Sequence, residues 1–178
     1  MEKTEIICAG FGGQGVLVTG LIIANAAMEN DREILWYPSY GVEMRGGTAN
    51  CNVKISDEEI ASPFVKEADI VIALNEASVS KFEPRVKENG YLFINSSTVK
   101  PRKYRSNIHV YEIPASDIAN KADNPKAANV VVLGALAKNT DLFNPDYLRK
   151  SIDSFFEKKG KINPRNAVCF NEGMKYFE

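Results

Sequence analysis

Short apolar runs that suit buried strands alternate along this chain with longer segments that suit helices. The first run is EIICA, at residues 5–9, and the clearest buried run is ADIVIAL, at residues 68–74. Continuous apolar runs of this length are typical of strands that are covered on both faces. The alternation therefore predicts an α/β fold, a three-layer α/β/α sandwich around a largely parallel, Rossmann-like central sheet.

Periodicity and turn residues set the bounds of the other elements. Further strands are predicted at residues 32–38, 48–56, 90–95 and 107–113. Helices are predicted at residues 16–30, 75–83, 114–122, 124–140, 144–160 and 163–178. The acidic run 57–59 is interpreted as a hairpin turn. With 178 residues and no repeat or linker, the chain is expected to form a single domain over residues 1–178.

Composition excludes several classes of function. The formal net charge is −1, which argues against a broad basic surface for nucleic acid but leaves local basic clusters open. No apolar run approaches the roughly 20 residues that span a bilayer, and the N-terminus lacks a signal pattern, so we expect a cytoplasmic protein without membrane contact. Cys8, Cys51 and Cys169 are far apart and form no C-x-x-C pair, so we expect buried free thiols and no metal site.

The sequence GFGGQG, at residues 10–15, lies between the first strand and the first helix. Its spacing matches G-x-G-x-x-G, in which backbone N–H groups at a helix start can bind phosphate. A nicotinamide or flavin site would also place an acidic residue at the end of the second strand, but that strand ends LWYPSY. The remaining interpretations are another phosphate-bearing ligand, a partner surface, or tight packing of the turn without a ligand.

A second unusual loop, PSYGVEMRGGTANC, occupies residues 38–51. Its Arg45 is followed by Gly46 and Gly47, which combines a planar, permanently charged donor with open backbone. The loop could bind a phosphate, a carboxylate or a partner chain, or could be a surface turn with a solvated charge. Loops that follow parallel strands gather at the carboxyl edge of the sheet, so we expect both glycine-rich loops to be neighbours there.

The sequence carries no self-sufficient catalytic set. Its single histidine, His109, lies within the strand NIHVYEI and is interpreted as a strand residue. The sequence has neither a G-x-S-x-G nucleophile motif nor a G-x-x-x-x-G-K-[ST] phosphate loop. The residues alone therefore indicate a ligand or partner surface, with no catalytic residue assigned.

Both loops resemble those of the gamma subunit of 2-oxoacid:ferredoxin oxidoreductases. The shared stretches are GFGGQGV at residues 10–16 and PSYGVEMRGGTANCNVKISDEEIASP at residues 38–63. ADIVIALNEAS, NVVVLGALAK and the closing NAVCFNEG extend the resemblance through the chain, although the terminal pattern N-x-x-A-F-x-x-G is displaced here. The style of the second loop is most similar to the 2-oxoglutarate and 2-ketoisovalerate types.

The resemblance implies one subunit of an enzyme that converts a 2-oxoacid and coenzyme A to acyl-CoA and CO2 while it reduces ferredoxin. The partners would be alpha and beta subunits, with a ferredoxin-like delta subunit in some complexes. Thiamine diphosphate, Mg and iron–sulfur clusters would belong to those subunits. The gamma-type chain would help to bind coenzyme A and cover the active site, and its terminal helix and residues 124–129 are further candidates to face the partners.

The residues assigned to coenzyme A or to partner-subunit contacts come from the two loops. They are Gly10, Gly12, Gly13, Gln14, Gly15, Ser39, Tyr40, Gly41, Glu43, Arg45, Gly46 and Gly47. Two alternatives to the gamma subunit of a 2-oxoglutarate enzyme stay open. One is a subunit of indolepyruvate oxidoreductase, and the other is a free-standing nucleotide-binding module.

Overall fold

The computed structural model describes residues 3–29, 32–40 and 48–177, and the side chain of Tyr40 lies outside this description. The strands are β1 Thr4–Phe11, β2 Glu33–Tyr40, β3 Thr48–Ser56, β4 Ala68–Ala73, β5 Val86–Asn95 and β6 His109–Ile113. The helices are α1 Val16–Met28, α2 Glu76–Phe82, α3 Ala115–Lys121, α4 Ala128–Asn139, α5 Pro145–Lys158 and α6 Arg165–Lys175. Two short 3-10 turns, η1 Glu83–Arg85 and η2 Pro125–Ala127, precede β5 and α4.

The six strands form one sheet in the order β2-β3-β1-β4-β5-β6. β1, β4, β5 and β6 pair in parallel, whereas β3 is antiparallel to both β1 and β2. β3 is therefore the one strand of the sheet that runs against the others. The expectation of a largely parallel sheet within an α/β fold is confirmed, with a hairpin of β2 and β3 added at one side.

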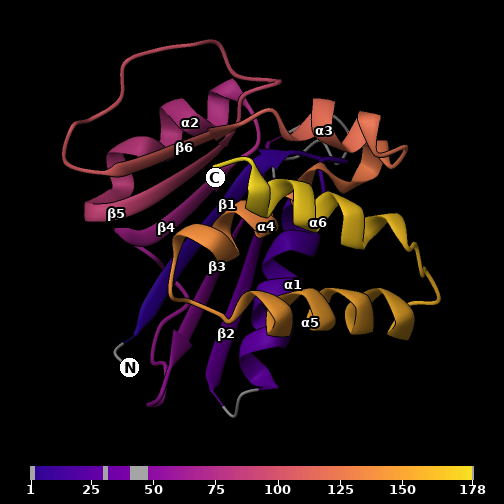
Figure 1. The fold of residues 1–178 in the computed structure, drawn as a ribbon. Helices are drawn as coiled ribbons and strands as arrows, with labels where there is room; N and C mark the ends of the chain where they lie inside the picture. Colours follow the sequence, from indigo (N-terminus) through magenta and orange to yellow (C-terminus); the bar gives the residue numbers. More distant parts are fainter. Residues whose placement is uncertain (1–2, 30–31, 41–47, 178) are drawn as a thin grey trace.

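Helices cover both faces of the sheet (Figure 1). On one face, Ile6 and Cys8 of β1 pack into the larger apolar core together with α1, α3, α4, α5 and α6. On the other face, Ile7 and Ala9 pack into a smaller core under α2 and the segment between β5 and β6. Successive β1 side chains thus alternate between two buried layers, which explains why this strand is apolar throughout.

The observed elements agree closely with those expected from the sequence. β3 has the predicted bounds, and its alternating residues Ala49, Cys51, Val53 and Ile55 are all buried. α5 begins after Asn144, whose side chain accepts hydrogen bonds from the backbone N–H groups of Asp146 and Tyr147. The last helix also forms as expected.

The interpretation of residues 57–59 as a hairpin turn is wrong. The neighbours of β3 in the sheet are β2 and β1, and β4 lies on the far side of β1. Residues 57–67 therefore cross the end of β1 and do not connect two adjacent strands. A run of turn-forming acidic residues marks a change of chain direction, but it cannot indicate which strand comes next in the sheet.

The three cysteines are free and buried, as expected from their spacing. Cys8 and Cys51 are register partners on β1 and β3, and Cys169 lies on the buried side of α6. Within the described ranges, no helix combines the length and the apolar character needed to cross a membrane.

Candidate functional site

The glycine turn connects β1 to α1 at the carboxyl edge of the sheet. Gly13 and Gly15 have φ values of 99° and 76°, a backbone region that favours glycine. Gly15 is the N-cap of α1 and provides no side-chain cap, and the first turn of the helix contains no acidic residue. The first N–H groups of α1 therefore lack the carboxylate or hydroxyl acceptor that caps many helices, and can serve an anion.

Gln14 fastens this turn to the end of β4. Its amide Nε2 donates to the backbone oxygen of Leu74 at 2.9 Å, and its Oε1 accepts from the Phe11 N–H at 2.7 Å. The same Oε1 accepts from the amide of Asn75 at 3.2 Å, and Asn75 in turn caps α2. One side chain thus holds together the ends of β1 and β4 and the start of α2, which gives the glycine turn a fixed shape.

The second predicted loop leaves and re-enters the sheet at the same edge. In the register, Gly10 of β1 faces Ala49 of β3, and Ala49 faces Tyr40 at the end of β2. The end of β2 and the start of β3 are therefore beside the glycine turn, as the sequence predicted. Ser39 is exposed near the end of β2.

The centre of the second loop is outside the described residues. This applies to Gly41, Glu43, Arg45, Gly46 and Gly47, and to the Tyr40 side chain. Their assignment to coenzyme A or to a partner subunit stays a prediction.

A cavity of about 160 Å³ opens beside the glycine turn. Its wall includes Gly13, Gln14, Asn95, Ser116 and Lys126. Asn95 ends β5 and is 1% exposed, and its amide Nδ2 donates to the Ser116 hydroxyl at 2.8 Å. The side-chain oxygen Oδ1 of Asn95 accepts from the Ser116 backbone N–H at 3.3 Å, so the wall on this side is preorganised. The cavity therefore combines amide and hydroxyl groups with one exposed lysine.

A second cavity, of 140 Å³, lies next to the first, and Lys126 lines both. The Asn129 side chain of α4 is 3% exposed and lines this second cavity. A Cβ atom on Gly15 would come within 2.9 Å of the Asn129 amide nitrogen, so this amide lies against the start of α1.

Sequence reasoning missed Asn95 and Ser116, and it named residues 124–129, which include Lys126 and Asn129, only as candidates to face the partner subunits. Asn95 carried a usable signal, because a polar residue ends the apolar strand GYLFIN at the edge where ligands bind in α/β folds. Ser116 lies beyond β6, and Lys126 and Asn129 lie near the start of α4, so only the strand order reveals that they meet the glycine turn.

The arrangement offers hydrogen-bond donors and one ammonium group, which suit an anionic ligand. The amides of Gln14, Asn95 and Asn129, the Lys126 ammonium and the start of α1 surround the two cavities. His109 lies on the edge strand β6, exposed and stacked on Tyr91 with ring centroids 5.2 Å apart. Among the described residues, no group of three or more His, Cys, Asp or Glu is placed to hold a metal ion.

Known proteins similar to this chain include subunits of two oxidoreductases. This chain is 39% identical to the ketoisovalerate oxidoreductase subunit VorA of Methanothermobacter marburgensis, and the match covers 98% of this chain and 37% of VorA. The chain therefore spans little more than a third of that relative. It is 34% identical to the 2-oxoglutarate synthase subunit KorC of Methanocaldococcus jannaschii, over 97% of this chain and 93% of the relative.

The fold is similar to that of a solved 2-oxoglutarate:ferredoxin oxidoreductase from Magnetococcus marinus, which holds 2-oxoglutarate, coenzyme A and succinyl-CoA. The TM-score is 0.84 at 24% identity, and the match covers 97% of this chain and 30% of the other. The family model described as pyruvate ferredoxin/flavodoxin oxidoreductase matches residues 5–176. The chain belongs to the pyruvate ferredoxin/flavodoxin oxidoreductase family.

Proposed function

We propose that this chain is the gamma subunit of a multi-subunit 2-oxoacid:ferredoxin oxidoreductase and that residues 1–178 form one gamma-type domain. The complex converts a 2-oxoacid and coenzyme A to acyl-CoA and CO2 and reduces ferredoxin. The observation that carries the proposal is the match to KorC over 93% of the length of that subunit. A relative of the same extent supports an equivalent subunit, whereas VorA contains this chain as a part.

In this proposal the chain helps to bind coenzyme A at the carboxyl edge. Coenzyme A carries phosphate groups, which suit backbone N–H groups at a helix start and an ammonium group. The uncapped start of α1 provides such N–H groups, and the exposed Lys126 provides the ammonium group. Gln14 fixes the turn that holds these N–H groups. When bound, coenzyme A supplies the thiol that accepts the acyl group, and this chain orients the carrier and excludes water.

The other parts of the reaction belong to other subunits in this proposal. The alpha and beta subunits hold thiamine diphosphate and Mg, and iron–sulfur clusters are carried by the beta subunit or by a delta subunit. Ferredoxin accepts the electrons, and the complex acts in the cytoplasm. This chain supplies no catalytic residue.

The proposed substrate is 2-oxoglutarate, with 2-ketoisovalerate as the second candidate. KorC, which this chain matches over nearly its full length, is a 2-oxoglutarate synthase subunit. VorA, to which the chain has the higher identity, belongs to a ketoisovalerate enzyme. Indolepyruvate has less support, because the IorB subunit of Archaeoglobus fulgidus is 31% identical over 75% of this chain.

The first test is activity of the purified complex on a panel of 2-oxoacids. Ferredoxin reduction should require coenzyme A and should be fastest with 2-oxoglutarate. Fastest turnover with 2-ketoisovalerate would replace the substrate assignment and leave the subunit assignment intact. Turnover by this chain alone, or a melting shift of the isolated chain with NAD or FAD, would contradict the proposal.

The second test is the affinity of the complex for coenzyme A. Lys126→Ala should weaken binding by about tenfold or more, because a charge-assisted hydrogen bond contributes about 1.5–3 kcal/mol. Arg45→Ala should have a similar effect if its guanidinium reaches a phosphate. Lys150→Ala is the matched control, since Lys150 is an exposed lysine of α5 that lines neither cavity. Isothermal titration measures wild type and the three variants, and unchanged affinity in both Lys126→Ala and Arg45→Ala would contradict the role.

A further inference from the structure

The second cavity, of 140 Å³, has a wall of amides and lysines. It lies where the start of α4 meets the start of α6 and residue 161 of the preceding turn. Among the described residues, no Asp or Glu lines it, and the rest of its lining is apolar. Its polar residues are Asn124, Lys126, Asn129, Lys161, Asn163 and Asn166. We call this feature the asparagine cavity.

Three of the four asparagines are buried in the wall. Asn124, Asn129 and Asn166 are 8%, 3% and 6% exposed. The Asn124 amide Nδ2 donates to Asn166 Oδ1 at 2.8 Å, and the Asn124 backbone N–H donates to the Ala119 carbonyl oxygen at 2.9 Å. These contacts fix the orientation of the wall, which therefore offers a preorganised polar surface to an occupant.

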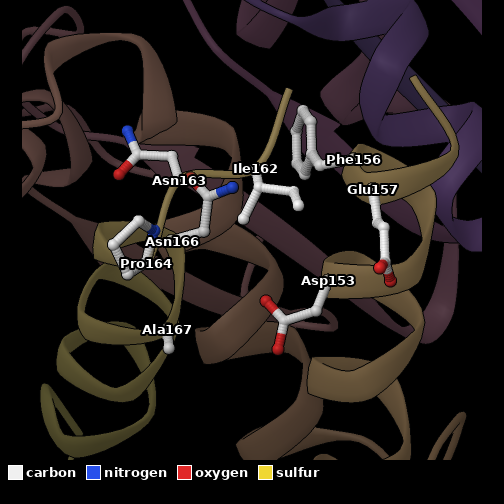
Figure 2. Close-up of a pocket in the computed structure, with 8 residues that line it drawn as sticks. All are labelled: Asp153, Phe156, Glu157, Ile162, Asn163, Pro164, Asn166 and Ala167. Atoms are coloured by element: carbon white, nitrogen blue, oxygen red, sulfur yellow. The ribbon is translucent and has the colours of Figure 1, made fainter. Parts of the chain in front are cut away.

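The fourth asparagine is held at the start of α6. The side-chain oxygen Oδ1 of Asn163 accepts from the Arg165 backbone N–H at 3.0 Å. Figure 2 shows Asn163 and Asn166 on the α6 side of the neighbouring hollow, with Asp153 and Glu157 on the α5 side. The Asn163 amide points away from both carboxylates (Figure 2). The two asparagines thus separate the asparagine cavity from the acidic side of that hollow.

The acidic groups around the asparagine cavity are offset by cations. Asp123 pairs with Arg165 at 3.0 Å, and Asp153 is paired within α5. Residues 157–161 read EKKGK, with one acid and three lysines, one of which pairs with Glu29. The two lysines of the cavity wall come in addition to these pairs. The cavity therefore has a positive surrounding, which favours an anion.

Two helix starts at the cavity have the same preference. α4 begins after Ala127, which provides no side-chain cap, and its first turn contains no acidic residue. α1 begins after Gly15 in the same way, and Asn129 lies against Gly15. The partial positive charge at the start of a helix stabilises a negative group nearby. Buried amides, lysines and helix starts thus all indicate an anionic occupant.

We propose that the asparagine cavity binds a phosphate monoester, and that in the assembled enzyme this group is the ribose 3′-phosphate of coenzyme A. A volume of 140 Å³ is that of a few water molecules, which suits one phosphate group and not a whole nucleotide. Coenzyme A carries its diphosphate and this monoester on the same ribose. Because Lys126 lines both cavities, a diphosphate at the glycine turn would place the monoester here.

The inference rests on the proposed function and adds the residues that distinguish coenzyme A from dephospho-coenzyme A, which lacks the 3′-phosphate. The test is isothermal titration of the assembled complex with each compound. Lys161→Ala should weaken coenzyme A binding about tenfold or more, because it removes a charge-assisted hydrogen bond, and should leave dephospho-coenzyme A affinity within about twofold of wild type. Lys150→Ala, on α5 and outside both cavities, should change neither affinity.

Asn163→Asp tests the same site with a change of charge at constant shape. Aspartate also accepts hydrogen bonds at a helix start, so the melting temperature should stay within about 2 °C of wild type. Its carboxylate would repel a phosphate in the cavity, so coenzyme A affinity should fall about tenfold or more while dephospho-coenzyme A affinity is retained. Asn171→Asp, on the exposed side of α6, is the matched control and should bind both compounds like wild type.

The outcomes separate this site from the proposed function. Equal loss of both affinities in Lys161→Ala, or no loss in either cavity variant, would overturn the assignment while coenzyme A binding by wild type upholds the proposed function. A wild-type complex that binds neither compound would overturn both. Inorganic phosphate is the third probe: equal wild-type affinity for the two compounds, with phosphate binding that Lys161→Ala removes, would assign the cavity to free phosphate and overturn the coenzyme assignment.

Discussion

Gln14 is the residue on which the geometry of the candidate site depends most. Its amide makes three hydrogen bonds, to Leu74, Phe11 and Asn75, at 2.9, 2.7 and 3.2 Å. Glycine alone leaves a turn many conformations, so a turn with Gly12, Gly13 and Gly15 gains its shape from this side chain. The glutamine therefore acts as a positioning residue for the backbone N–H groups that would meet a phosphate.

Gln14→Ala should loosen the glycine turn without unfolding the protein. The three lost hydrogen bonds contribute about 1 kcal/mol each, so amide exchange in residues 10–15 should become on the order of 100-fold faster. Hydrogen exchange measured by mass spectrometry checks this. Asn25→Ala, which removes one exposed amide bond to Glu29, is the control and should leave the turn unchanged. Exchange in residues 10–15 equal to that of wild type would contradict the positioning role.

At this scale the sequence predicted one half of the candidate site. The glycines and Gln14 are contiguous and carry a known spacing, and so could be found by inspection. Asn95, Ser116, Lys126 and Asn129 come from three later segments, of which only residues 124–129 were named, and then as candidates to face the partners rather than as part of this site. They could not be assigned because a cavity wall depends on which strand ends are adjacent, and no local pattern encodes this.

At the scale of elements, α4 and α6 approach each other through two glycines. A Cβ on Gly134 would come within 2.1 Å of the Phe170 backbone oxygen, and a Cβ on Gly173 within 2.0 Å of the Val131 backbone oxygen. The two helices therefore touch through their backbones. This contact holds α6 close against α4.

Gly134→Ala and Gly173→Ala should each destabilise the protein, although alanine favours helix formation. The added methyl must push the helices apart, which costs about 1–3 kcal/mol and exceeds the propensity gain of about 1 kcal/mol when both backbones are rigid. Urea unfolding checks this. Asn171→Ala, on the exposed side of α6, should leave the free energy of unfolding nearly unchanged. A stability gain in either glycine variant would show that the helices can separate freely.

Elements were predicted well because their signals are local. The amphipathic pattern and the Asn144 cap of α5 act within a few residues, and so do the alternating residues of β3. The direction of β3 was not predicted. An alternating strand has the same residue pattern in a parallel and in an antiparallel pair. The direction of β3 follows from its position between β2 and β1, which the local pattern does not encode.

At the scale of the whole molecule, a charge network joins the strands near the start of β1. Glu5 pairs with Lys54 of β3 at 3.0 Å and with Lys3 at 2.8 Å, and Lys87 of β5 lies 3.6 Å away. Lys54 is 3% exposed. Burial alone would raise the pKa of the Glu5 carboxyl, but its hydrogen bonds with Lys3 and Lys54 outweigh burial and hold the pKa below the ordinary 4.5.

This network should make stability depend on pH in the acid range. Because the folded-state pKa of Glu5 is lowered, its contribution is present above about pH 4.5 and is lost as the pH falls through the folded-state pKa. Glu5→Gln should cost about 3 kcal/mol at pH 7, since it leaves a buried Lys54 charge unpaired. Urea unfolding at pH 7 and pH 3 should show the difference from wild type shrinking at pH 3. Glu88→Gln is the control, and an equal difference at both pH values would contradict the assignment.

The single antiparallel strand has a consequence for how such a chain can diversify. β2 and β3 form a hairpin whose strands are paired up to Tyr40 and Ala49, beside the glycine turn. Insertions or substitutions between Tyr40 and Ala49 leave the register of β2 and β3 beneath them unchanged. Evolution can therefore exchange the tip to suit a new cargo or neighbour while the scaffold beneath it is inherited intact.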